Sequence, residues 1–162
     1  MSITKPHLLT KEGLEKLTKE LEYLTTVRRE EVAERLQRAF EDGQDDDFVE
    51  SAELEAARNE QSFLEGRIAE LEDILKNYQL IDEDDDSPHD FVRVGDKVTV
   101  SEEGVDDVEV YHLVGAAEAD PIAGKISNES PLGKALLGAK VGEVVRVNAP
   151  NGIIEFRVVK IE

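Results

Sequence analysis

Apolar residues recur every three or four positions along two long stretches in the first half of the chain. After position 52 the repeat is carried by Leu54, Ala57, Gln61, Leu64, Ile68, Leu71, Leu75 and Tyr78. Before position 42 it runs through Leu14, Leu17, Leu21 and Leu24, and then shifts, as a coiled-coil stutter allows, to Val27, Val32, Leu36 and Ala39 or Phe40. Alternating spacings of three and four are typical of a coiled-coil seam, so the pattern predicts two long amphipathic helices.

The turn between these helices is too short for any connection except an antiparallel hairpin. Two helices of about 30 residues would each extend about 45 Å. Thr10 is the expected N-cap of the first helix, and Glu12 is placed favourably near the positive end of its dipole. The stretch 41–51, which reads EDGQDDDFVES, therefore lies at the tip of a long rod.

The second half of the chain has the texture of short strands. The β-rich pieces are FVRVGDKVTV, VEVYHLVG, VGEVVRVNAP and IIEFRVVKIE, separated by glycine, Asn-Gly and Asp-Asp turns. Within this half, SPLGKALLG predicts a short helix with Ser130 as N-cap, Pro131 at the first helical position and Gly138 as terminator. We expect an α+β protein with a coiled-coil domain at 1–81, an acidic linker at 82–90 and a globular domain with a mostly antiparallel sheet at 91–162.

Charge narrows the classes of function. The chain has 38 acidic and 19 basic residues and a net charge of −19, which excludes a protein that holds nucleic acid chiefly by covering phosphates with Lys and Arg. With no cysteine there is no disulfide framework, thiolate nucleophile or Cys-ligated zinc. The N-terminus lacks the apolar core of a signal peptide, and no apolar run approaches the roughly 20 residues of a membrane span. We expect a cytoplasmic protein without a membrane partner.

Few residues offer catalytic chemistry. The three histidines, His7, His89 and His112, stand far apart in the sequence, and no phosphate-binding glycine loop, nucleophile elbow or zinc signature is present. What remains is the group of five acids in the tip, Asp42, Asp45, Asp46, Asp47 and Glu50.

Two interpretations of these acids are open. Asp47 and Glu50 are three residues apart at the start of the second helix, which fits a capping arrangement. A cap, however, needs one or two acids, whereas carboxylates in a cluster are the usual ligands of Mg²⁺. Such a site is incomplete alone, so a rod that carries it suggests that a partner provides the other half.

Across nearly its whole length the chain resembles the Gre family of bacterial transcription elongation factors. The resemblance is carried by LTKEGLEKLTKELEYLTTVRR, ESAELEAARNEQSFLEGRIAELEDIL and VGAAEADPIAGKISNESPLGKALLGAKVGEVVRVNAPNG. It implies an antiparallel coiled coil followed by a domain of FKBP-like fold. It also implies a factor that is not itself an enzyme. In the family the globular domain docks at the rim of the secondary channel of RNA polymerase, and the coiled coil enters the channel and stimulates cleavage of the nascent RNA 3′ end in backtracked complexes.

The resemblance also assigns roles to the tip residues. The family's tip motif matches positions 46–54, which places Asp47 and Glu50 on the acidic pair that assists catalysis by binding metal. Asp45 and Asp46 are further candidate ligands. The Mg²⁺ is shared with the polymerase active centre and is not held tightly by the factor alone. The sequence departs from the motif at Asp46 in place of glycine, Ser51 in place of asparagine and Leu54 in place of an aromatic residue.

Further roles follow from the same resemblance. Arg28 and Arg29 are expected to contact the RNA 3′ segment, although ion pairing with nearby glutamates is the alternative. Polymerase docking is expected of Asp120, Ser127, Ser130, Pro131 and Leu132, for which capping and packing are the alternatives. We expect a monomer.

Two other functions compete with cleavage stimulation. An enlarged acidic tip is also similar to that of Gre-like inhibitory factors of some thermophilic bacteria, which occupy the same channel and block the polymerase. A free-standing metal-dependent hydrolase is disfavoured because the tip offers too few fixed ligands and no enclosing pocket.

Overall fold

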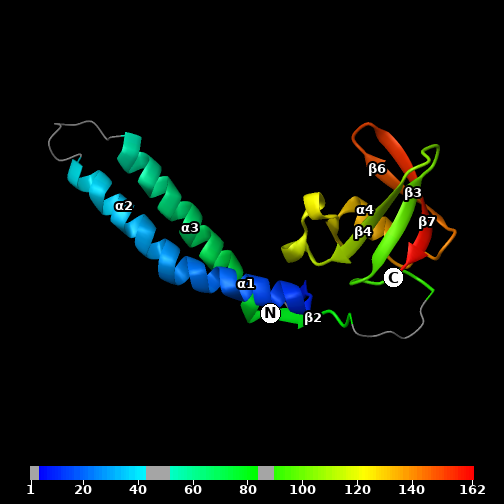
Figure 1. The fold of residues 1–162 in the computed structure, drawn as a ribbon, viewed down its shortest axis with the longest axis horizontal. Coiled ribbons are helices and arrows are strands. Elements are labelled where there is room, and N and C mark those ends of the chain that lie inside the picture. Colours follow the sequence, from blue (N-terminus) through cyan, green and yellow to red (C-terminus); the bar gives the residue numbers. More distant parts are fainter. Residues whose placement is uncertain (1–3, 43–51, 84–89) are drawn as a thin grey trace. The chain divides into compact units, whose positions relative to one another are not determined.

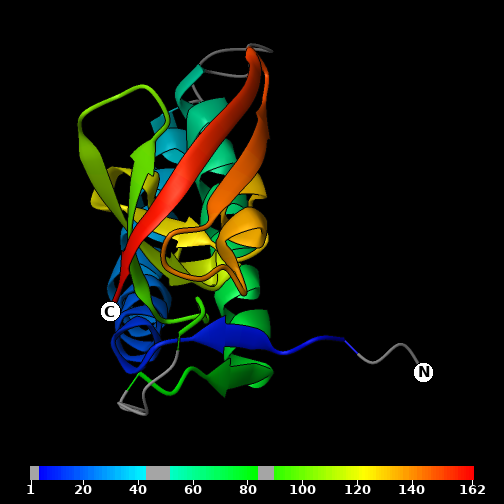
Figure 2. The same ribbon diagram turned by 90° about the vertical axis from the view of Figure 1, so that its right-hand side faces the viewer.

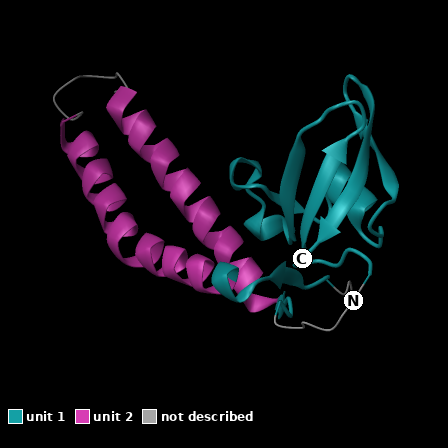
Figure 3. Ribbon diagram, turned by 45° about the vertical axis from the view of Figure 1, so that its right-hand side comes forward, with its two compact units in different colours: residues 1–13, 78–162 teal, residues 14–77 magenta. Residues whose placement is uncertain are grey.

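The computed structural model describes residues 4–42, 52–83 and 90–162 (Figure 1). Packing divides the chain into two compact units (Figure 3). One unit, Leu14–Asn77, is a helical hairpin, and the other joins Met1–Gly13 to Tyr78–Glu162 and contains the sheet. The predicted α+β class is confirmed. The domain bounds inferred above stay a prediction.

The first arm of the hairpin is one continuous helical path made of three elements. These are α1 (Lys11–Tyr23), the π-helix η1 (Leu24–Arg28) and α2 (Arg29–Asp42). The second arm is α3 (Ala52–Lys76). Thr10 is confirmed as the N-cap of α1, because its Oγ1 accepts a hydrogen bond of 2.9 Å from the backbone N of Gly13. Within the described ranges, no helix is long and apolar enough to cross a membrane.

The predicted seam is mostly confirmed by burial. The predicted positions that are buried are Leu17, Val32 and Ala39 on the first arm and Ala57, Leu64, Ile68 and Leu71 on the second. Ile74, which was not predicted, is buried, whereas Leu75 is half-buried and Val27 and Gln61 are exposed. The placement of Tyr78 on the seam is wrong. The helix ends at Lys76 while the apolar spacing continues, and Tyr78 lies in a strand instead.

The shift in the repeat of the first arm has a specific structural cause. A regular repeat continued beyond Leu24 would reach positions 31, 35 and 38, but burial falls one residue later, on Val32, Leu36 and Ala39. The π-helix accommodates this extra residue, since the backbone N of Arg29 donates to the carbonyl of Leu24, five residues earlier. The predicted stutter is thus a single-residue insertion.

The sheet of the other unit has five strands in the order β5–β4–β3–β7–β6. The strands are β3 (Lys97–Glu102), β4 (Val108–Val114), β5 (Lys125–Ser127), β6 (Val144–Ala149) and β7 (Gly152–Ile161). Figure 2 shows the long strand β7, in red, between β6 and β3. The sheet is mostly antiparallel as predicted, but β5, which the sequence pattern did not reveal, pairs in parallel with β4.

The core of this unit lies between one face of the sheet and the helix α4 (Pro131–Leu136). Buried residues from the strands and the helix form one cluster that includes Val98, Val100, Leu113, Leu136 and Phe156. The predicted helix signals are confirmed: Ser130 caps α4, Pro131 occupies its first turn and Gly138 follows it with a φ of 79°, a left-handed conformation that favours glycine.

The N-terminal segment also belongs to this unit, which the sequence did not predict. Strand β1 (His7–Leu9) pairs in parallel with β2 (Tyr78–Leu80). A Cβ at Gly115 would lie 2.1 Å from the carbonyl oxygen of Leu8, so this close approach requires glycine. The carboxylate of Glu118 accepts hydrogen bonds from the backbone N and the Oγ1 of buried Thr10, at 2.7 and 2.6 Å.

Removing the inserted residue of the π-helix tests the phase argument. Deletion of exposed Thr26 should convert η1 into regular α-helix while Val32, Leu36 and Ala39 stay on the seam. The free energy of unfolding, measured by urea titration with circular dichroism, should remain within about 1 kcal/mol of the wild-type value.

Deletion of exposed Glu34 is the matched control. Because Glu34 lies between Val32 and Leu36, its loss must rotate the residues on one side of the deletion away from the seam. The free energy of unfolding should then fall by about 2 kcal/mol because apolar area becomes exposed. An equal decrease in the free energy of unfolding for the two deletions would contradict the interpretation of the π-helix as a single-residue insertion.

Candidate functional site

The candidate metal ligands Asp45, Asp46, Asp47 and Glu50 lie outside the described residues, so their prediction is untested. Their flanks are described. The helix α2 ends at exposed Asp42, and the antiparallel partner α3 begins at Ala52. In the described part of the chain, no group of three or more His, Asp or Glu side chains could hold a metal ion.

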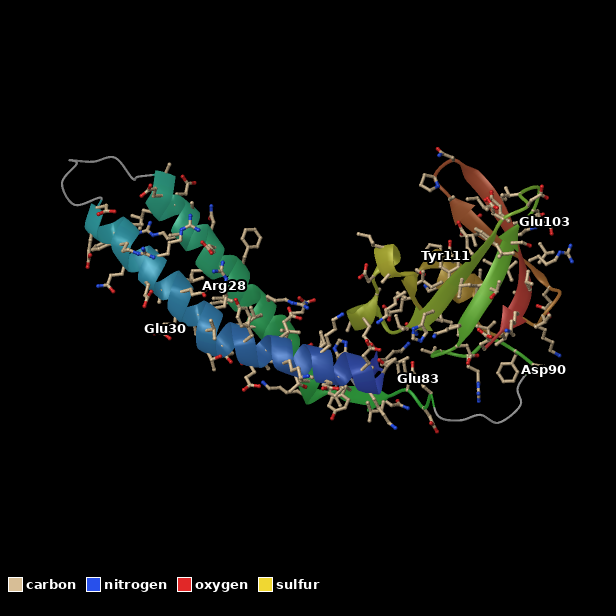
Figure 4. The ribbon with its side chains drawn as sticks, in the orientation of Figure 1. Arg28, Glu30, Glu83, Asp90, Glu103 and Tyr111 are labelled. Carbon is tan, nitrogen blue, oxygen red and sulfur yellow. The ribbon has the colours of Figure 1, made fainter. Side chains whose placement is uncertain are left out.

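Arg28 lies at the end of the π-helix and faces the other arm of the hairpin (Figure 4). Its guanidinium pairs with Glu60 of α3 and with Glu31, the latter at 3.1 Å. Glu60 also pairs with Arg35 of α2, so one carboxylate joins two arginines. Hydrogen bonds with Glu31 and Glu60 raise the pKa of Arg28 above its usual value.

Arg29 makes a similar contact one residue later. Its Nε and Nη2 donate to Oε1 and Oε2 of Glu65 at 2.9 and 2.8 Å, a bidentate arrangement. The hydrogen bond from Arg29 lowers the pKa of Glu65. Both arginines therefore make the ion pairs that were the alternative to RNA contact. An RNA role stays a prediction, and it requires these carboxylates to yield or share the arginines.

A further ion pair between the arms was not anticipated. Arg67 of α3 donates from Nε and Nη2 to the two carboxylate oxygens of Glu20 at 2.8 and 3.0 Å, and from Nη1 to Glu70 at 2.9 Å. Residues 47 apart in sequence make this pair, so only the register of the hairpin could have revealed it. The hydrogen bonds with Glu20 and Glu70 raise the pKa of Arg67.

Of the candidate docking residues, Asp120 forms a turn of its own. Its Oδ1 accepts hydrogen bonds from the backbone N of Ile122 and of Ala123, which caps the short 3₁₀ helix η4 (Pro121–Ala123). The backbones of Asp120 and Lys125 exchange two hydrogen bonds of 2.8 and 2.9 Å. Asp120 therefore fixes the loop that leads into β5.

Ser127 and Ser130 connect β5 to α4. The Oγ of Ser130 donates to the carbonyl oxygen of Ser127 at 2.6 Å and accepts from the backbone N of Gly133 at 3.1 Å. Ser127 Oγ accepts from the backbone N of Glu129 at 3.0 Å. Pro131 is exposed, whereas Leu132 packs against the sheet core. Capping and packing thus account for these residues locally, and a docking role stays a prediction.

Comparison with known proteins identifies the family. The model described as "Transcription elongation factor, N-terminal" matches residues 7–80, and that described as "Transcription elongation factor, GreA/GreB, C-term" matches residues 87–162. The chain belongs to the GreA/GreB family of transcription elongation factors. Its predicted resemblance to Gre factors is confirmed.

Individual GreA/GreB relatives match the chain from end to end. Transcription elongation factor GreA of Thermoanaerobacter pseudethanolicus is 52% identical over 159 residues, covering 98% of this chain and 99% of the relative. GreA of Acetivibrio thermocellus is 48% identical over 161 residues, covering 99% of each. Among solved structures, GreA factor homolog 1 (Gfh1) of Thermus thermophilus is 36% identical, covering 98% of this chain and 99% of that one, with a TM-score of 0.43. The family assignment rests on the sequence matches.

Substitution of Ser130 in this GreA/GreB chain tests whether its hydroxyl stabilises α4 as an N-cap. Ser130→Ala removes the hydroxyl that caps α4, so the free energy of unfolding should fall by about 1 kcal/mol in urea titration. Ser130→Thr keeps a hydroxyl and should restore most of the loss. An alanine variant as stable as wild type would show that the cap does not stabilise α4.

Proposed function

We propose that this GreA/GreB-family protein binds bacterial RNA polymerase, inserts its hairpin into the secondary channel and stimulates cleavage of the nascent RNA 3′ end in backtracked complexes. The polymerase is the catalyst and the factor is its regulator. The observation that carries the proposal is the antiparallel pairing of α2 and α3, which end and begin at Asp42 and Ala52. The acidic stretch that joins these two helix ends in the sequence would therefore be presented at the end of a narrow helical rod.

The chemistry of the tip fits Mg²⁺, because carboxylate oxygens are its preferred protein ligands. Asp47 and Glu50 would hold the ion, with Asp45 and Asp46 as further ligands. A second metal shared with the polymerase active centre supplies charge that stabilises the attacking and leaving oxygens of phosphodiester hydrolysis. The contribution of this chain is to deliver the carboxylates. One or two protein carboxylates make an incomplete site, so in this proposal the factor acts only together with the polymerase.

The charge of the chain supports the same route. A net charge of −19 favours approach to a positively charged channel, and this guidance weakens as salt screens it. Arg28 and Arg29 are exceptions on this acidic surface. In the complex they would exchange Glu60 and Glu65 for RNA phosphates, which offer the same bidentate geometry to a guanidinium. The chain acts as a monomer in this proposal.

Inhibition of the polymerase is the second candidate function. It is favoured by the surplus of tip acids, since Asp42, Asp45 and Asp46 add charge beyond the Asp47 and Glu50 pair. Three more carboxylates could hold the ion in a geometry that does not support hydrolysis.

The decisive experiment adds the protein to a stalled, backtracked elongation complex assembled with polymerase from the same organism. We expect shortened RNA, and we expect the cleavage rate with Asp47→Asn plus Glu50→Gln to fall to that of the polymerase alone. These isosteric changes remove ligand charge while keeping the side-chain size. Gel analysis of end-labelled RNA gives the rate.

The triple variant Asp42→Asn, Asp45→Asn, Asp46→Asn is the matched control, because it removes more charge yet keeps the proposed ligand pair. It should still stimulate cleavage, at a rate between those of the wild type and of Asp47→Asn plus Glu50→Gln, because it loses only the further ligands. Slowed elongation without cleavage by the wild-type protein, relieved in this triple variant, would establish inhibition instead. Cleavage of free RNA without polymerase would contradict both candidate functions.

A further inference from the structure

Ile122 is the most exposed large apolar residue among those the structure describes. Its side chain is 100% exposed, compared with 63% for Ile153 and 58% for Val108 in the same unit. An isoleucine in water forgoes the free energy that its burial would release. Single exposed apolar residues are common, so exposure alone does not indicate a function.

The loop that carries Ile122 is held by backbone and side-chain contacts rather than by packing of Ile122 itself. Asp120 caps the turn through Ile122 and Ala123, and Gly124 ends it with a φ of 75°. The paired backbones of Asp120 and Lys125 close the loop. A Cβ at Gly124 would lie 3.2 Å from the carbonyl oxygen of Val110, so the loop approaches β4 closely. Each contact fixes the backbone, and the isoleucine is left to project from a preformed turn.

The position of this turn links it to the candidate docking residues. The turn leads directly into β5, the edge strand of the sheet, and β5 ends at Ser127, whose carbonyl oxygen accepts the hydroxyl of Ser130. Ile122 is therefore continuous with the segment from Asp120 to Pro131. The other exposed residues of that segment are either small or charged, namely Asp120, Pro121, Ala123, Glu129 and Pro131, and Leu132 packs against the core.

We propose that Ile122 is the apolar anchor of the contact between this unit and RNA polymerase, and that it inserts into an apolar pocket on the polymerase surface. The inference rests on the proposed function and adds a residue that supplies binding energy. Interfaces commonly depend on a few preorganised anchors that fill pockets and are surrounded by polar contacts. A rigid turn with a projecting isoleucine meets this requirement, because little conformational entropy remains to be lost on binding.

The Asp120 carboxylate near Ile122 indicates which side chains would surround that pocket on the polymerase. Both hydrogen bonds to the Asp120 carboxylate end on Oδ1, and in the described structure no further donor reaches Oδ2. Because Asp120 is exposed, its second carboxylate oxygen is open to solvent and accessible to a donor on a partner. The anchor therefore suits a pocket whose rim carries a Lys or Arg side chain, in agreement with a partner that attracts a strongly acidic protein.

The test measures the affinity of the full-length protein for core RNA polymerase from the same organism, by fluorescence anisotropy of a labelled factor. Ile122→Ser should raise Kd about 10-fold or more, as expected when a buried apolar side chain is lost from an interface. Ile122→Leu keeps the apolar volume and should bind within about 3-fold of wild type. The melting temperature of both variants should equal that of the wild type, since Ile122 is fully exposed in the described structure and buries no apolar area there.

Ile153→Ser is the matched control. Ile153 is also exposed, but it lies at the start of β7, which neighbours β6 at the edge of the sheet away from β5. It should bind like the wild type. Equal affinities for Ile122→Ser and wild type, or equal losses for both serine variants, would overturn the inference while leaving the proposed function intact. Wild-type protein that does not bind polymerase would overturn both. Sedimentation of the protein without polymerase tests whether Ile122 instead contacts a second copy of the chain. Self-association that is lost in Ile122→Ser would show this and would overturn the inference.

Discussion

The hairpin depends on one constraint, which is that the apolar seam of each arm must face the other arm along its whole length. The first arm has one residue too many for a regular repeat, and the π-helix at Leu24–Arg28 takes up that residue so that Val32 and Ala39 remain buried. Without this adjustment the turns nearest the tip would rotate away from α3. The acidic stretch then would not be carried by two paired helices, and the rod would lose its defined end.

The same adjustment determines where the basic side chains point. Arg28 and Arg29 leave the π-helix towards Glu60 and Glu65 of α3, and Arg67 makes the reciprocal contact with Glu20. In a chain with twice as many acids as bases, like charges along the two arms would repel, and each of these bridges offsets that repulsion locally. Exposed ion pairs contribute little stability individually. Their value here is in register and in keeping guanidinium groups ordered near the rod surface.

The sequence was sufficient to predict features that depend on neighbouring residues in the chain, such as the helix starts at Thr10 and at Ser130 and Pro131, and most of the seam. It was insufficient where distant segments meet. The pairing of β1 with β2, the contact of Thr10 with Glu118 and the pair of Arg67 with Glu20 each join residues whose partners no periodicity specifies. Tyr78 shows the opposite error, because its spacing matched the helix although the chain had already left it. The tip ligands follow from family resemblance.

The charge of the tip implies that the two units contribute differently to binding. Carboxylates clustered at a tip repel one another, so they contribute little affinity until a cation neutralises them, and much of the binding energy must come from elsewhere in the chain. The unit that contains the sheet offers an exposed isoleucine on a fixed turn, and salt weakens such an apolar contact far less than it weakens contacts between surface charges. Docking through that unit would raise the effective concentration of the tip at its target without requiring the tip to bind tightly. Under the proposed function, a weakly bound tip would leave when polymerisation resumes, whereas a tightly bound one would obstruct the polymerase.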